Sequence, residues 1–591
     1  MAQSLEQFEW VLSAVGELDR VPERLRGLLR AGVPVTIRPG VGTCVHTDLI
    51  DAGVIPDPNV GMNEAEVEWV SWTSWEYATR FAADPRAIND PHARVGFERL
   101  DTIATVRLND GLLGEASSEF VPWWFAAAGV LRAGVNEFRV RLESPLARVH
   151  ELAKDHGRPH NGDEQGWHPY NLMRKAACDF GWDWGPRLAT CGLASPSVRW
   201  GKPTARGPAR AVPRRASFRV PAYELVVDGR PTFAKGANWI PEGLWPRDRT
   251  PERIRGRLKQ AKAAGMNMIR VWGGGRYESE AFYDACDELG LWVWQDFMFA
   301  CGAYPEEEPW WSLIEAEARH QVARLAEHPC VVVWCGGNEN HWAMQSWGFA
   351  ERLRPGRTWG HRLYHDVLPR IVGELSPHTP YVPDSPWSEP PDHPNLGERG
   401  DRHTWNHFGA EFTSHVPRYC SEFGLQSPST RATLEEAGLT PSSPGEPIPA
   451  ALIARQRGPG GMARWYDEMF AKARVPAPAG FEDWLGKAHQ LQADWLFLAV
   501  VWLRLNQDVC KGALIWQLND AWPGLSWSLI DSKGREKPAY HAVARAFADR
   551  VRCSLPTAEG TIEAAINDTD EPWEAIPGWV IPPRSTARRP L

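Results

Sequence analysis

In the first part of the chain, apolar and polar positions alternate along the sequence. Between residues 69 and 143 this alternation runs through the stretches WVSWTSWEYATRF, HARVGFERLDTIATVRLND and NEFRVRLESPL. A period of two is typical of strands that bury one face, and Asn109, Asp110 and Gly111 supply a turn signal. Residues 1–200 are therefore predicted to form an antiparallel β-sandwich.

After residue 200 the pattern changes twice. Residues 201–219, GKPTARGPARAVPRRASFR, are rich in Pro, Arg and Ala and have no hydrophobic period, which is typical of a linker. From residue 220 onward, short apolar segments alternate with amphipathic stretches such as PERIRGRLKQAKAAG and WSLIEAEARHQVARLAEH. Thr250 before Pro251 indicates a helix start, and Gly265 and Gly290 fall where helices should end.

Eight of the short apolar segments are predicted to be strands. They cover residues 233–239, 266–273, 291–297, 330–336, 379–384, 402–406, 418–423 and 512–518. Strands and helices that alternate in this way predict a (β/α)8 TIM barrel over residues 220–549, with its catalytic groups at the C-terminal ends of the strands. Residues 550–591 are predicted to be a remnant of a C-terminal β domain or a tail.

Two of the predicted strands end close to a glutamate. The fourth runs from Cys330 to Asn338 and Glu339, and the seventh runs from Arg418 to Glu422. A charge placed just past an apolar strand is unusual for a structural side chain. Glycoside hydrolysis requires two carboxyl groups on either side of the scissile bond, about 5 to 5.5 Å apart when the anomeric configuration is retained.

Other strand ends combine tryptophan with polar side chains. They carry Arg270, Trp272, Asp296, Trp516, Asn519, Asp520 and Trp522. The chain contains 32 Trp against 11 Tyr, and flat indole rings stack well on the apolar faces of sugars. The mixture is expected of a sugar subsite, although Asp296 and Asp520 fit the capping of loops better. No catalytic role is assigned to His403 or His407.

Long stretches of the chain resemble the glycoside hydrolase family 2 β-mannosidases. The stretches that carry the resemblance include NLMRKAACDFGWDWGPRLATCG, MNMIRVWGGGRYE, WCGGNEN, SEFGLQSPS and GALIWQLNDAWPGLSWSLIDSKGREKPAYH. The resemblance implies a galactose-binding-like jelly-roll domain before the barrel. It also implies a retaining exo-β-mannosidase that removes terminal, non-reducing β-D-mannose from oligosaccharides, without a cofactor.

The resemblance also implies roles for individual residues. Glu339 would be the general acid/base and Glu422 the nucleophile. Asn338 would hydrogen-bond the sugar 2-OH, and Asp183 would reach from the first domain to other sugar hydroxyls. Three tryptophans would shape or stack on the glycone: Trp272, Trp405 and Trp522.

A nucleophilic carboxylate has to be ionised at the working pH. Arg270 at the end of the second predicted strand could hold Glu422 in its charged form. A purely structural ion pair of Arg270 is an equal alternative, since both arrangements shift pKa values.

The chain departs from the family pattern in three places. We expect that the linker replaces the immunoglobulin-like domain that usually precedes the barrel and that the C-terminal β-sandwich domains are lacking. Lost contacts of this kind expose apolar surface, which leaves instability or homo-oligomer formation open. Gly337 stands where Asn is common, and its freedom could loosen the loop that holds Asn338.

Composition and charge exclude several classes of partner. The net charge of -9 and the pI near 6.1 offer no cationic face for nucleic acid. The most apolar run, residues 495–503, is far shorter than the roughly 20 residues of a membrane span, and the N-terminus does not have the pattern of a signal peptide. Ten scattered cysteines predict neither disulfides nor a metal site. A cytoplasmic protein with no metal or membrane partner is expected.

Three other functions compete with the exo-β-mannosidase hypothesis. The first is a related exo-β-glycosidase, such as a glucosaminidase or a relative of β-galactosidase or glucuronidase. The second is an endo-β-mannosidase. The third is a carbohydrate-binding protein without catalysis.

Overall fold

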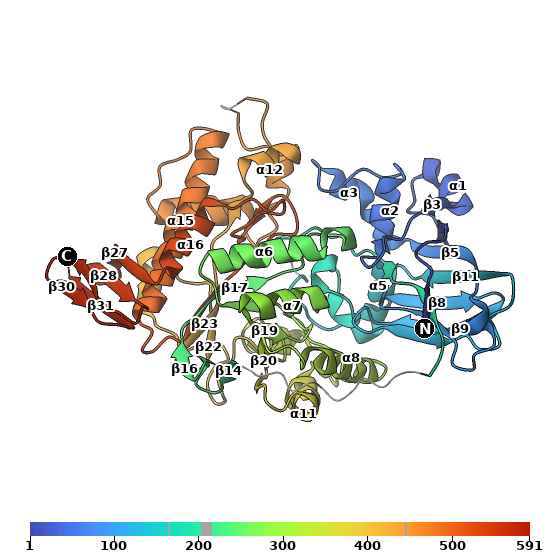
Figure 1. The fold of residues 1–591 in the computed structure, drawn as a ribbon. Coiled ribbons are helices and arrows are strands. Elements are labelled where there is room, and N and C mark those ends of the chain that lie inside the picture. The colour runs from blue at the N-terminus through green and yellow to red at the C-terminus, as the bar shows by residue number, and fades with distance from the viewer. Residues whose placement is uncertain (164–165, 203–214, 444–445, 591) are drawn as a thin grey trace.

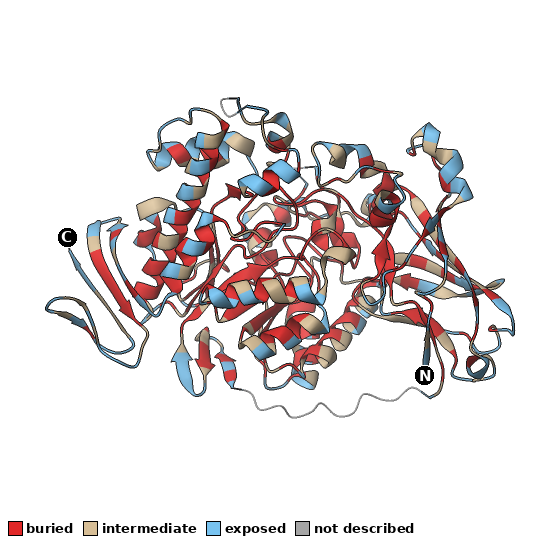
Figure 2. Ribbon diagram, turned by 45° about the horizontal axis from the view of Figure 1, so that its top comes forward, coloured by how far each residue is buried: buried red, intermediate tan, exposed pale blue. Residues whose placement is uncertain are grey.

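The structure is a computed structural model that describes residues 1–163, 166–202, 215–443 and 446–590. Figure 1 shows a β-rich region that contains the N-terminus, a central barrel with helices around it, and a small sheet that carries the C-terminus on the far side. The barrel strands are buried, whereas the outer faces of the surrounding helices are exposed, as Figure 2 shows. Among the described residues, no helix is long and apolar enough to cross a membrane.

The N-terminal region consists of antiparallel sheets packed around an aromatic core. One sheet has the order β1 (Ala2–Ser4), β13 (Ser197–Arg199), β6 (Arg94–Phe97) and β10 (Trp123–Ala126). The larger sheet has the order β3 (Val33–Val35), β2 (Trp10–Val15), β5 (Ser74–Ala82), β11 (Val135–Leu142), β8 (Ile103–Leu108) and β9 (Gly111–Ser117). A third, short sheet is formed by β4 (Thr43–Cys44), β12 (Gly192–Ala194) and β7 (Arg99–Asp101).

Alternation along β5 explains why this region folds as it does. Trp75, Tyr77 and Phe81 of β5 point into the core, where they join Trp10 and Phe138. The alternating pattern begins at Ser74, because residues 68–72 form a 3-10 helix. The α-helices of this region are α1 (Glu23–Ala31), α2 (Val45–Asp51), α3 (Asn63–Val67), α4 (Pro85–Ile88) and α5 (Pro145–His156).

The central sheet has eight parallel strands in the order of a TIM barrel, so the predicted fold class is confirmed. Their order is β21 (Tyr381–Val382), β20 (Val331–Cys335), β19 (Trp292–Asp296), β18 (Met268–Val271), β17 (Ala234–Trp239), β25 (Gly512–Ile515), β23 (Tyr419–Phe423) and β22 (Asp401–Thr404). All eight lie within or next to the segments predicted from the sequence. The order begins and ends with the fifth and sixth strands, where the apolar runs are weakest.

Helices cover the outside of the barrel (Figure 1). The main ones are α6 (Pro251–Ala263), α7 (Glu280–Leu289), α8 (Trp310–Leu325), α11 (Leu368–Leu375), α15 (Phe481–Leu505) and α16 (Pro538–Phe547). The Thr250 side chain caps α6 by accepting a hydrogen bond from the backbone N–H of Arg253. Gly290 ends α7 with φ 65°, a left-handed conformation that glycine adopts without strain. These two helix boundaries were predicted.

A small sheet closes the N-terminal end of the barrel. It contains β14 (Ala216–Arg219), β15 (Glu224–Val227) and β16 (Arg230–Thr232). Phe218 of β14 packs against Trp294 and Tyr419 from the barrel strands. Prediction of a linker up to residue 219 was therefore wrong for β14, because alternation over only four residues is hidden in an Arg- and Pro-rich stretch. Residues 203–214 of that linker lie outside the described residues.

The C-terminal residues form two further antiparallel units. One is the sheet β27 (Arg550–Thr557), β28 (Gly560–Asn567) and β31 (Ser585–Pro590), and the other is the hairpin β29 (Trp573–Ile576) and β30 (Trp579–Ile581). Val551 and Ile566 of the sheet join the core of the barrel.

Candidate active site

Charged side chains from four barrel strands meet at the C-terminal edge of the sheet. β18 supplies Arg270, β19 supplies Asp296, β23 supplies Glu422, and Asn338 and Glu339 follow β20. All five are buried. They converge because the C-terminal ends of parallel strands lie along one edge of a barrel.

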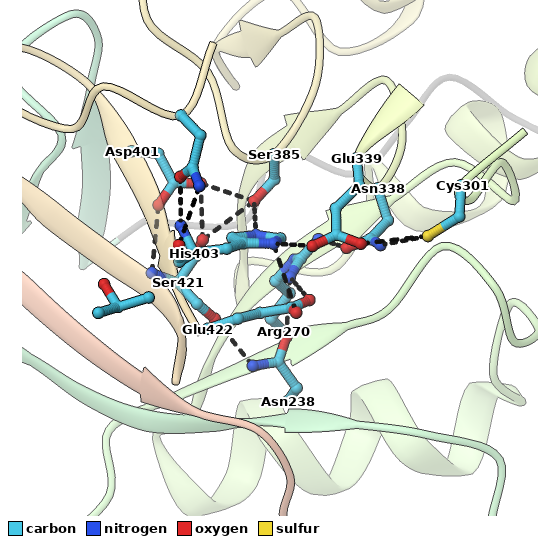
Figure 3. A network of polar contacts seen from close by, with 12 residues as sticks. Asn238, Arg270, Cys301, Asn338, Glu339, Ser385, Asp401, His403, Ser421 and Glu422 are labelled. Atoms are coloured by element: carbon cyan, nitrogen blue, oxygen red, sulfur yellow. Dashed lines mark hydrogen bonds and ion pairs between the residues drawn. The ribbon is translucent and has the colours of Figure 1, made fainter. Parts of the chain in front are cut away.

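The guanidinium of Arg270 organises this edge (Figure 3). Its Nη1 donates to Glu422 Oε1 at 2.5 Å and to Asn238 Oδ1 at 3.0 Å. Its Nη2 donates to Asp296 Oδ2 at 2.8 Å and to Asn338 Oδ1 at 2.7 Å. A planar guanidinium with several donors fixes its acceptors relative to one another. Because the Asn338 carbonyl faces Arg270, the amide NH2 of Asn338 points to the other side, where it donates one hydrogen to Cys301 Sγ at 3.4 Å and keeps a second.

Glu422 is poised between two opposing influences. Burial raises the pKa of Glu422 to about 7, against the lowering effect of His403 and Arg270, and Glu339 raises it further. Two carboxyl groups that share one small space disfavour the state in which both are ionised. Burial and Glu339 therefore oppose the ionisation of Glu422, whereas His403 and Arg270 favour it.

Glu339 is held in an uncommon backbone conformation. Its φ is 59° and its ψ is 13°, in the left-handed region, where it precedes helix α9 (Asn340–Ser346). The backbone N–H of Glu339 donates to the Ser385 carbonyl at 2.7 Å. The side chain lies 2.7 Å from His403 Nδ1 through Oε1, and its Oε2 accepts a hydrogen bond from Cys301 Sγ at 3.2 Å. Strained residues of this kind concentrate at functional sites, where surrounding contacts fix them.

The two glutamates face each other across a short gap. Oxygen atoms of Glu339 and Glu422 lie within 4.8 Å of each other, with His403 Nδ1 near both. This separation suits carboxyl groups that act on opposite sides of one anomeric carbon with retention, and it is too short to admit the extra water of an inverting pair.

A cavity of about 400 Å³ opens in front of the glutamates. Its walls are mostly aromatic, with a few polar groups. The residues that line it are Asn161, Trp182, Asp183, Trp272, Cys301, Asn338, Glu339, Trp342, Trp347, Trp405, Glu422, Pro459, Arg464, Trp465, Trp516 and Trp527. Aromatic walls with few, convergent polar groups are typical of sites for small ligands.

Asp183 enters this cavity from the N-terminal region. Burial raises the pKa of Asp183 to about 8, and the charges of Glu339 and Glu422 add to the shift. Its Oδ1 is buried without a hydrogen-bond partner among the described residues. A carboxyl that has a raised pKa and an unpartnered oxygen is suited to exchange hydrogen bonds with ligand hydroxyls.

Two groups of described residues place donor atoms close enough together to hold a metal ion. In one, His328 already bonds Asp287 at 2.8 Å and Glu280 at 3.1 Å through its two ring nitrogens. In the other, His403 Nδ1 lies against both catalytic-site glutamates while Nε2 contacts Ser385. In each group the imidazole nitrogens are used by hydrogen bonds within the protein, which gives no reason to place a metal there.

Known proteins match this chain in its N-terminal region and over most of its length. Residues 25–195 match the family model described as glycosyl hydrolase 2 galactose-binding domain-like. β-Mannosidase B of Aspergillus oryzae is 30% identical over 87% of this chain and 74% of its own length, and that of Thermothelomyces thermophilus is 29% identical over 86% and 73%. The crystal structure of a β-D-mannosidase from Dictyoglomus thermophilum superposes with a TM-score of 0.85 at 28% identity, covering 100% of this chain and 85% of that one.

The chain belongs to the glycoside hydrolase family 2 β-mannosidases. An exo-chitosanase from Amycolatopsis orientalis shares the fold with a TM-score of 0.65, at 13% identity, covering 97% of this chain and 76% of that one.

Of the three tryptophans expected around the glycone of a family 2 β-mannosidase, one lies elsewhere. Trp272 and Trp405 line the cavity, whereas Trp522 is absent from its lining. The Trp522 ring lies 4.2 Å from the Arg455 guanidinium, and its Nε1 donates to the Pro58 carbonyl at 3.3 Å. Trp522 therefore joins two parts of the fold, and Trp527 lines the cavity instead.

Gly337, the departure from the usual Asn in these β-mannosidases, is tightly packed. A Cβ at Gly337 would come within 2.8 Å of the Phe299 carbonyl oxygen and 2.5 Å of Asn340 Nδ2. The expectation that Gly337 loosens the loop of Asn338 was wrong. The absence of a side chain at Gly337 lets this loop pack closely against Phe299 and Asn340.

His403 is the residue that sequence reasoning missed. It is fully enclosed, and its ring lies between Glu339 and Glu422. Alternation along the chain could have found it, since His403 lies in β22 two residues before Trp405, which was already expected at the site.

Proposed function

We propose that the chain is a retaining exo-β-mannosidase that hydrolyses terminal, non-reducing β-D-mannose residues of oligosaccharides. The observation that carries this proposal is the pair of Glu339 and Glu422 oxygens within 4.8 Å of each other at one cavity. The choice of mannose as the substrate sugar rests on relatives that are described as β-mannosidases.

The contacts of each glutamate support a division of roles. Glu422 bonds Arg270 at 2.5 Å, so its ionised form is stabilised and it attacks the anomeric carbon. Glu339 has no arginine or lysine within bonding distance among the described residues, which suits a group that holds a proton. Glu339 protonates the leaving oxygen and then takes a proton from the water that releases the sugar.

Groups for the glycone surround this pair. The Asn338 amide, oriented by Arg270, is placed to hydrogen-bond the 2-OH, an interaction that strengthens as positive charge develops on the ring. Asp183 is placed to bond further hydroxyls, and the faces of Trp272 and Trp405 border the sugar. The volume of about 400 Å³ lies near the lower end of ligand sites and favours one terminal residue over a long chain.

The test is a panel of 4-nitrophenyl β-glycosides. The proposal expects the β-mannoside to be hydrolysed at least tenfold faster, as kcat/KM, than the β-glucosaminide, β-galactoside and β-glucuronide. Faster hydrolysis of another member of the panel would mean that the chain acts on that sugar instead of mannose, by the same two-glutamate mechanism. Binding of mannose without any product would favour a carbohydrate-binding protein, and cleavage inside a mannan without release of mannose would favour an endo-enzyme.

A cytoplasmic location and formation of homo-oligomers stay predictions. Cell fractionation tests the location, and light scattering of the purified chain tests the oligomeric state.

A further inference from the structure

The imidazole of His403 lies where it can contact both glutamates. Its Nδ1 is 2.7 Å from Glu339 Oε1 and 3.4 Å from Glu422 Oε2 (Figure 3). The ring is buried, and the edge of the Trp342 ring covers it, with ring centroids 6.4 Å apart. One nitrogen therefore faces two acidic groups at the centre of the site.

The other nitrogen of His403 is tied to the barrel wall. Ser385 Oγ donates its hydrogen to Asp401 Oδ2 at 2.6 Å, and Ser421 binds the same carboxylate through Oγ at 2.7 Å. A hydroxyl has one hydrogen, so Ser385 Oγ accepts from His403 Nε2, 3.1 Å away. His403 Nε2 thus carries a hydrogen, and any second proton of the ring lies on Nδ1 between the glutamates.

The charges around the ring favour that second proton. Burial lowers the pKa of His403, but Glu422 and Glu339 outweigh this effect, so its pKa is raised above the ordinary value; Arg270 opposes them. Asp401 lies beyond Ser385 as a further negative group.

The two glutamates differ in their other partners. Glu422 has Arg270 at 2.5 Å whether or not His403 is charged. Glu339 has the Cys301 thiol and the His403 ring, so His403 is its cationic neighbour among the described residues. A lone ionised carboxylate in a buried site is costly without such a partner.

On the basis of the proposed function, we propose that His403 is a positioning residue that stays protonated and donates its Nδ1 hydrogen to whichever glutamate is ionised. In the first step Glu422 bonds the anomeric carbon, and the proton of Glu339 leaves with the aglycone oxygen. In the second step a water proton goes to Glu339, the water oxygen bonds the anomeric carbon, and Glu422 is released. One negative charge passes from Glu422 to Glu339 and back, while His403 gains and loses no proton.

The test compares His403→Phe and His403→Gln with wild type on 2,4-dinitrophenyl β-mannoside. This leaving group needs no acid, so the first step is preserved. Without the imidazolium, ionised Glu339 is destabilised and deglycosylation slows. We expect kcat to fall at least tenfold in the Phe variant, with a burst of dinitrophenol, and sodium azide, which needs no base, to restore turnover. Gln, which keeps a donor without charge, should show the same changes to a smaller extent.

The pH profile separates positioning from a structural role. Removal of the positive charge disfavours an ionised carboxylate in this site, so the acidic limb of kcat should move up by about one unit in either variant. His407→Gln, a nearby histidine outside the cavity lining, should leave the profile unchanged.

The inference would be overturned if the His403 variants lost kcat equally on 2,4-dinitrophenyl and methyl β-mannosides, if the acidic limb of their pH profile did not move, and if azide had no effect. The proposed function would remain intact. A wild-type chain that hydrolyses neither substrate would overturn both.

Discussion

Two of the buried charge clusters among the described residues differ in which effect sets the pKa values of their central groups. The glutamate cluster at the barrel mouth comprises Arg270, Asp296, Glu339, His403 and Glu422. The lysine cluster, which joins the N-terminal region to the barrel, comprises Asp101, Glu119, Lys175, Asp179 and Arg276.

In the lysine cluster, opposite charges dominate at Lys175 and Asp179, whereas burial raises the pKa of Asp101. Lys175 Nζ lies 2.6 Å from Asp101 and 2.7 Å from Asp179. The surrounding carboxylates raise the pKa of Lys175 despite burial, and Arg276 and Lys175 lower the pKa of Asp179 despite burial. These two groups are charged across the whole physiological range, and together they act as a structural joint.

In the glutamate cluster and its neighbour Asp183, burial and like charges dominate. The pKa of Glu422 rises to about 7 and that of Asp183 to about 8. Groups whose charge changes near neutral pH are suited to acid/base chemistry. Burial of charged groups alone therefore does not identify a catalytic site. Fully paired charges stabilise the fold, whereas buried groups with raised pKa values beside a cavity take part in the reaction.

The largest expected effect is the loss of activity when the glutamate cluster is neutralised. Glu422→Gln and Glu339→Gln should each lower kcat/KM for an aryl β-mannoside at least about 10³-fold. Glu339→Gln should not lower the melting temperature, because it removes a buried like charge, whereas Glu422→Gln also breaks the buried ion pair with Arg270. Glu119→Gln is the control: it should lower the melting temperature and leave the activity of folded protein within about threefold. If the kcat/KM of Glu422→Gln stayed within tenfold of wild type, the glutamate cluster would not be the site of the reaction.

Lys175→Met addresses the other side of the comparison. It leaves Asp101 and Asp179 buried without their lysine, which should lower the free energy of unfolding by about 3–5 kcal/mol. Urea unfolding measures this loss, with the exposed Lys154→Met as a control that changes little. A decrease of less than about 1 kcal/mol in the free energy of unfolding would mean that the lysine cluster does not stabilise the fold.

Asp183 tests whether a poised group binds substrate in its neutral form. Asp183→Ala should lower kcat/KM about 10- to 100-fold through the loss of hydrogen bonds. Asp183→Asn, which is neutral at every pH, should remain within about threefold of wild type at pH 7. If Asn is as harmful as Ala at pH 7, Asp183 acts as a carboxylate instead.

The smallest expected effect is the shape of the pH profile. Glu422 must be ionised to attack, and its raised pKa means that the ionised fraction falls as the pH drops through about 7. In wild type, kcat/KM should decrease about tenfold per unit below that value. A flat profile down to pH 5 would show that Arg270 holds Glu422 charged more strongly than burial opposes it.

Much of the fold could be predicted because each barrel strand is a short apolar run followed by a helix. Prediction failed where the pattern is local and weak. β14 is four residues long, and its alternation is hidden in the stretch that was predicted to be a linker. Its boundaries are set by tertiary packing.

The site could be predicted only in part. Motifs pointed to Glu339, Glu422 and Asp183, which line one cavity. The place of Trp522 and the contacts of His403 depend on which segments meet in space, and neither follows from spacing along the chain.

Proton NMR of β-mannoside hydrolysis tests the central claim most directly, namely that Glu339 and Glu422 act as a retaining pair on one anomeric carbon. The account predicts that β-mannose appears first and later equilibrates with the α-anomer. Initial release of α-mannose would contradict it.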